Sequence, residues 1–159
     1  MEKTKTIKIA RYRTSPYIVN YVTNGGIKTY QWAGSKGNKI DIKEIPQEVV
    51  EYLLMNSVCF REGELKIIED TPEAKEAVSN IDDIEEYRNN THSKEEAKKI
   101  LEGNINKMKS ELKKITNKDE KKFFIEVAKE IKLDSSAKRK FLSEWYGVKQ
   151  DILFDDTEE

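Results

Sequence analysis

The sequence has few of the residues on which disulfide, metal and catalytic sites depend. It contains one cysteine, Cys59, and one histidine, His92, in 159 residues. A single cysteine cannot form a disulfide within the chain, which favours a reducing compartment. His92 has no cysteine or carboxylate at the spacing of a metal site. We therefore expect neither a metal nor a cofactor.

Long hydrophobic runs are also missing. The mean hydropathy is −0.80, and no stretch approaches the roughly 18 apolar residues that indicate a membrane-spanning helix. The N-terminus lacks the apolar core of a secretory signal. The sequence therefore predicts no signal peptide, no transmembrane segment and no membrane partner.

No group of catalytic residues emerges from the remaining motifs. Cys59 stands between Val58 and Phe60, which predicts a buried thiol, whereas a nucleophile needs a base or a positive charge beside it. The glycine-containing turns match no phosphate-binding loop. The acidic pairs within residues 82–86 lack the ligand spacing of a calcium loop. We expect no catalytic residues and a protein that is not an enzyme.

Charge is abundant and is segregated by sign. Charged residues make up 37% of the chain. Residues 1–43 carry nine basic and two acidic residues, whereas residues 44–90 carry four and thirteen. Residues 91–154 are basic again, and four of the last five residues are acidic. Blocks of opposite sign can steer assembly, although they also occur as plain solvated surface.

Alternating apolar and polar residues predict strands over 4–13, 17–22 and 27–33. Asn24 and the two glycines after it predict a tight turn that joins the last two strands into a hairpin. Residues 39–42 can re-enter the sheet. Pro46 predicts a helix start, because its missing N–H costs nothing there. Further strands are expected at 58–60 and 65–68.

Helix start signals dominate the rest of the chain. Thr71 and Pro72 predict a short helix. The polar, acidic stretch 81–92 predicts a linker, with a helical turn around Ile84 and Tyr87 as an open alternative. The starts of four further helices are expected at Ser93, at Asn104, at Asn117, and at Asp134 or Ser135. Gly147 is expected to end the last of them.

These elements predict an α+β protein, with a small β-rich N-terminal domain that has one helix and a compact C-terminal bundle of short helices. The expected divisions are a β-rich docking domain over 1–70, a short helix and acidic linker over 71–92, a helical bundle over 93–148, and an acidic tail over 149–159.

Three runs, at residues 30–34, 45–49 and 60–67, resemble a layout of small accessory virion proteins of tailed bacteriophages. In those proteins a short β unit carries an I-P-x-E-V helix followed by an F-x-x-G-x-L hairpin, and the resemblance covers about residues 15–70. It implies a structural role in a head, neck or tail, assembled in the host cytoplasm by docking on repeated subunits. Residues 123–147 are similar to small helix-extension-helix modules that bind DNA or protein.

The first functional hypothesis is therefore a non-enzymatic structural protein of the virion that binds other virion subunits. Aromatic and arginine side chains dominate the binding energy of many interfaces. The predicted partner contacts are Arg11, Arg13, Tyr21, Tyr30 and Trp32.

The second hypothesis is a nucleic-acid-binding accessory protein. A basic, aromatic sheet can stack bases of a single strand, and the last predicted helix begins with cations that can contact phosphates. The predicted phosphate contacts are Lys138, Arg139 and Lys140. The pI of about 6.1 and the acidic middle of the chain argue against this hypothesis.

Overall fold

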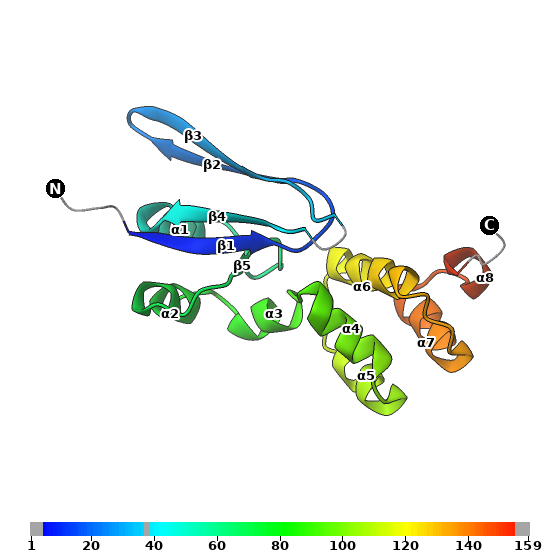
Figure 1. Cartoon of the computed structure of the whole chain (residues 1–159). Coiled ribbons are helices and arrows are strands. Elements are labelled where there is room, and N and C mark those ends of the chain that lie inside the picture. Colours follow the sequence, from blue (N-terminus) through cyan, green and yellow to red (C-terminus); the bar gives the residue numbers. More distant parts are fainter. Residues whose placement is uncertain (1–4, 37–38, 155–159) are drawn as a thin grey trace. The chain divides into compact units, whose positions relative to one another are not determined.

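The computed structural model describes residues 5–36 and 39–154, and the chain divides into two compact units, Met1–Thr91 and His92–Glu159. The described part of the first unit combines antiparallel sheets with helices, whereas that of the second contains helices and turns (Figure 1). The predicted α+β class is therefore confirmed. No helix in these described ranges is long and apolar enough to cross a membrane.

The first unit contains two antiparallel sheets. Its strands are β1 (Thr6–Arg11), β2 (Tyr17–Thr23), β3 (Gly26–Trp32), β4 (Asp41–Pro46) and β5 (Lys66–Ile67). The order in the three-stranded sheet is β4-β1-β5, while β2 and β3 form a separate hairpin. Thr23 pairs with Gly26, so Asn24 and Gly25 form a two-residue turn as predicted.

Three helices complete the described part of the first unit: α1 (Gln47–Asn56), α2 (Pro72–Ser79) and α3 (Ile84–Asn89). Pro46 ends β4 and stands at the N-cap of α1, so the strand runs directly into the helix. The core joins apolar residues of the sheets to one side of α1. Its fully buried members include Ile7, Ile9, Trp32, Ile45, Val49, Val50 and Leu53.

Two predictions for this unit are wrong. Residues 58–60 form turns instead of a strand, because their carbonyl groups accept hydrogen bonds from the amides of residues 62–64. The segment 81–92 has the helical turn expected around Ile84 and Tyr87, as α3. It is not a solvated linker, however, because up to Thr91 it packs against its own unit. Tyr87 lies in the core, and its hydroxyl accepts a hydrogen bond of 3.0 Å from the backbone N–H of Ile67. Burial of an apolar ring therefore overrides the acidic composition.

The second unit begins where the helical bundle was expected. Its helices are α4 (Lys94–Glu102), α5 (Ile105–Leu112), α6 (Lys118–Glu130), α7 (Ser136–Tyr146) and α8 (Gln150–Leu153). The side chains at the predicted starts accept backbone hydrogen bonds at the N-termini of the first four, and Gly147 ends α7 with a left-handed backbone. These predictions are confirmed.

The predicted acidic tail is wrong at its start. Residues 150–153 form α8, and Leu153 and Phe154 are buried in the second unit. The guanidinium carbon of Arg139 lies 5.2 Å from the centre of the Phe154 ring, a cation–π contact that holds this end of the chain. The rest of the predicted tail, residues 155–159, lies outside the described residues.

Candidate functional site

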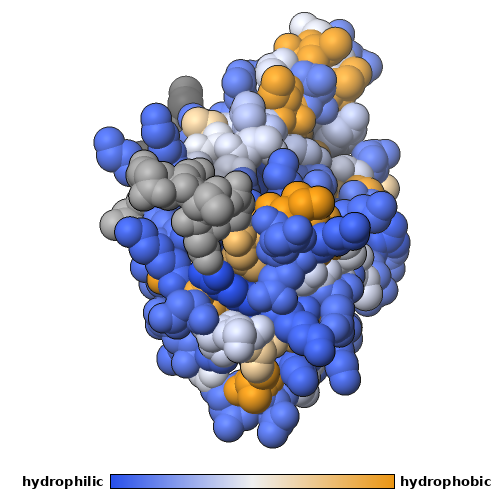
Figure 2. Space-filling view, turned by 90° about the vertical axis from the view of Figure 1, so that its right-hand side faces the viewer, coloured by the Kyte–Doolittle hydropathy of each residue, from blue (hydrophilic) through white to orange (hydrophobic). Residues whose placement is uncertain are grey.

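The outer face of the β2–β3 hairpin is uncharged and exposed. Side chains alternate across a strand, and the register pairs Ile18 with Gln31, Asn20 with Thr29, and Val22 with Ile27 on one face. All six side chains are exposed, and the Thr29 hydroxyl donates a 2.8 Å hydrogen bond to Asn20 Oδ1. We call these six residues the hairpin outer face. Figure 2 shows hydrophobic surface on the lobe at the top of the view, which β2 and β3 form.

The opposite face of the hairpin packs against its own unit. Val19 and Trp32 are buried there, and the ring of Tyr21 meets that of Tyr52 on α1 edge to face, with centroids 5.1 Å apart. Tyr30 is half-buried on the same face. The aromatic side of the hairpin is therefore its inner face, and the aliphatic side is exposed.

Three of the five predicted partner contacts are buried, so their expected exposure is wrong. Trp32 is 0% exposed, and its indole Nε1–H donates a 3.0 Å hydrogen bond to the carbonyl of Ile9. Arg11 and Arg13 are almost as deeply buried. Tyr21 and Tyr30 keep part of their surface, so a contribution of these two rings to binding stays a prediction.

The two arginines hold the turn before β5. Arg11 donates to the Glu64 carbonyl (2.7 Å) and to its carboxylate (2.8 Å). Arg13 donates to the carbonyls of Glu62 (2.8 Å) and Asn90 (3.0 Å), and its guanidinium also lies 3.2 Å from the Glu64 carboxylate. Buried guanidinium groups need such partners. The two arginines therefore stabilise the fold of the first unit.

The predicted phosphate contacts on α7 are partly occupied within the second unit. Lys138 Nζ donates a 2.7 Å hydrogen bond to the Leu101 carbonyl, and Arg139 Nε donates one of 2.6 Å to the Leu133 carbonyl. Lys140 is exposed. Of the three predicted phosphate contacts, only Lys140 is therefore exposed, whereas a cluster of three exposed cations was expected.

The cysteine is buried, and the histidine pairs with a carboxylate. Cys59 is 1% exposed, and burial raises the pKa of its thiol to about 11, as expected for an unreactive thiol. His92 is largely buried: its Nδ1 lies 2.9 Å from a carboxylate oxygen of Glu120, and its ring packs against Phe124. Among the described residues no group of three His, Cys, Asp or Glu side chains could hold a metal ion.

The buried phenol and thiol groups predict a stability loss at high pH. Burial raises the pKa of Tyr17 and Tyr87 from 10.0 to about 12, and that of Cys59 from 9.0 to about 11. The unfolded chain therefore loses these protons at lower pH than the folded unit does. The free energy of unfolding of the first unit should stay level up to about pH 9 and then fall.

Urea unfolding over a pH series tests this, with Trp32 as the fluorescent probe in a Trp145→Phe background. Tyr87→Phe is the matched variant: it should be less stable throughout and show a shallower fall above pH 10, the ordinary pKa of its phenol. Stability that stays level to pH 12 would contradict the assignment.

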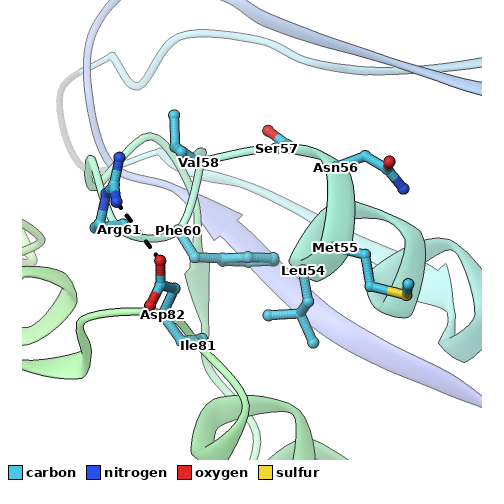
Figure 3. Close-up of a pocket in the computed structure, with 9 residues that line it drawn as sticks. All are labelled: Leu54, Met55, Asn56, Ser57, Val58, Phe60, Arg61, Ile81 and Asp82. Carbon is cyan, nitrogen blue, oxygen red and sulfur yellow. Dashed lines mark ion pairs between the residues drawn. The ribbon is translucent and has the colours of Figure 1, made fainter.

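A second surface feature, which the motifs did not indicate, is a hollow of about 710 Å³ at the end of α1 (Figure 3). Its lining comes from the last turn of α1, the turn after it, and the connection between α2 and α3. The lining residues are Leu54, Met55, Asn56, Ser57, Val58, Phe60, Arg61, Ile81 and Asp82. Sequence reasoning missed it because three separate segments form it.

Comparison with known protein families gives two matches along the chain. The model described as YonA N-terminal domain matches residues 5–83, and the model described as YonA C-terminal domain matches residues 93–152. The boundary between them falls close to the division between the two units. Neither the curated proteins nor the solved structures gave a match.

Proposed function

Since the chain belongs to the YonA family, whose domains indicate a phage-related protein, we propose that it is a non-enzymatic structural protein of a bacteriophage virion. In this role it docks on repeated subunits of the head, neck or tail through the hairpin outer face. The buried Cys59, with its raised pKa, supports a role without nucleophilic chemistry.

One observation carries this proposal: the hairpin outer face has no charged side chain, although 37% of the chain is charged. Three aliphatic side chains stay exposed there, with Val22 directly opposite Ile27 beside the turn. Exposed apolar surface of this kind is typical of protein contacts. The exposed edges of the hairpin surround it with backbone groups that a partner protein can hydrogen-bond.

The same face argues against nucleic acid as the partner. Phosphate contacts need lysine or arginine, and the hairpin outer face has neither. Arg11 and Arg13, two cations of the basic N-terminal segment, are engaged inside the first unit. Binding of DNA is therefore an outcome that would count against the proposal.

Ile27→Lys should exclude the chain from assembled particles. Ile27 is 67% exposed, so the substitution spares the core while it places a charge in the docking face, where desolvation would oppose binding. We expect at least a roughly tenfold lower copy number in particles purified from a producing host, measured by quantitative mass spectrometry.

Ile152→Lys is the matched control, because Ile152 is 66% exposed and lies in the second unit. It should enter particles like the wild type, and both variants should melt at the wild-type temperature. A wild-type chain that accumulates in producing cells but is missing from particles would overturn the virion role. Normal incorporation of Ile27→Lys would overturn the docking face alone.

A further inference from the structure

The hollow at the end of α1 has an apolar floor and an apolar, exposed rim. Phe60 and Ile81 are buried beneath it, and the Phe60 ring points toward Leu54 at the end of α1 (Figure 3). Met55 and Val58 form part of its lining while remaining exposed; Met55 is 85% exposed. Methionine side chains are flexible and polarisable, so they adapt to apolar groups of differing shape.

The charges around the hollow are predominantly acidic. Among the described lining residues, Arg61 and Asp82 carry charge, and they pair with each other at 3.6 Å. The acidic excess comes from residues beside the lining, including Glu86, whose carboxylate lies 3.8 Å from Arg61. Asp82 is 88% exposed in its side chain. Glu51, one helical turn before Met55, is also exposed. The last turn of α1 carries no basic residue, so the negative end of the helix dipole adds to this potential.

We propose that this hollow binds a short basic segment of a partner protein, which inserts a large apolar side chain and places a lysine or arginine against the acidic rim. The apolar floor would take the inserted side chain, with Met55 closing over it. Asp82 and the carbonyl end of α1 would receive the cation. An acidic rim repels phosphate, which excludes nucleic acids and anionic lipid surfaces as occupants.

This site shares no residue with the hairpin outer face, so the inference goes beyond the proposed function and stands without it. A chain with two separate docking sites on one unit can bridge neighbouring proteins. Binding at two linked sites strengthens attachment well beyond either contact alone.

Selection from a displayed library of random short peptides on the immobilised full-length chain tests the proposal. The enriched peptides should combine a large apolar residue with a neighbouring lysine or arginine. One such peptide is then titrated into protein whose methionine methyl groups carry ¹³C. The Met55 signal should shift, whereas the signal of Met108, which is 0% exposed and lies in the second unit, should not.

Variants then assign the binding to this hollow. Met55→Glu should weaken the peptide at least about tenfold while the melting temperature stays unchanged, since the side chain is exposed. Asp82→Asn should weaken it by about threefold and flatten its salt dependence. Ile27→Lys should bind the peptide like the wild type. A negative result for the hollow can therefore be distinguished from a negative result for the hairpin outer face.

Three results would overturn the inference. They are a selection that enriches no common pattern, one that enriches acidic peptides, and a Met55→Glu variant that binds the peptide as tightly as the wild type. A peptide that shifts the Met108 signal and leaves Met55 unchanged has bound elsewhere and counts against the hollow equally.

Discussion

Gly63→Ala should destabilise the first unit by about 3–5 kcal/mol, among the largest effects of any single methyl group in this chain. Gly63 has a φ of +78°, and an added Cβ would lie 1.9 Å from the carbonyl oxygen of Asn90 and 2.7 Å from Nη2 of Arg13. The nearest obstacle is backbone, which cannot rotate away as the end of a flexible side chain can.

The destabilisation caused by Gly63→Ala extends beyond the turn that contains Gly63. Arg13 donates hydrogen bonds to the carbonyls of Glu62 and Asn90, so it joins the turn that contains Gly63 to the segment after α3. Moving Asn90 away would lengthen one of these bonds. A buried guanidinium that loses an acceptor is expensive.

Gly147→Ala provides the matched control. Gly147 has a similar φ of +84°, but nothing lies within 4 Å of its added Cβ. Its variant should therefore show only the backbone cost of a left-handed alanine, about 1–2 kcal/mol, in the second unit. Hydrogen–deuterium exchange of protected amides in β1 and in α6 measures the two units separately. Equal, small losses in both variants would contradict the steric argument.

Local sequence rules predicted the elements whose signals are themselves local. The hairpin register follows from its turn residues and from the alternation along β3. The start of α4 follows from Ser93 and Glu96, which form the expected capping box. In each case the residues that carry the signal are also the residues that make the hydrogen bonds.

Predictions of which side chains are buried in the core and which are exposed agree less well with the structure. The sequence predicts partner contacts at Tyr21, Tyr30 and Trp32, but these side chains lie on the hairpin face that packs against the core. These rings offer more apolar area for burial than Ile18, Val22 and Ile27 do, so they pack inward against the core of the first unit. Tyr87 behaves in the same way, and its burial brings an acidic segment into the first unit. The hollow at the end of α1 required three distant segments to be placed together.

Trp32→Ala should destabilise the first unit by about 3–5 kcal/mol, because it removes a large, fully buried side chain and leaves a cavity. It also removes the indole N–H that donates to the Ile9 carbonyl on β1. Trp32→Phe should cost less, since it refills most of the volume and loses mainly this hydrogen bond, about 1–3 kcal/mol. Urea unfolding followed by circular dichroism measures both variants.

The stability losses of Trp32→Ala and Trp32→Phe show whether Trp32 acts in the core or in partner binding. A tryptophan that contacted only a partner could be replaced by alanine with little change in the stability of the isolated chain, and unchanged stability in Trp32→Ala would contradict the buried position. If the stability of Trp32→Ala falls as expected, a loss of assembly in this variant results from unfolding and gives no evidence of a direct contact with a partner. Ile27→Lys changes an exposed side chain on the opposite face of the same strand, so it tests docking while the core that Trp32 fills stays intact.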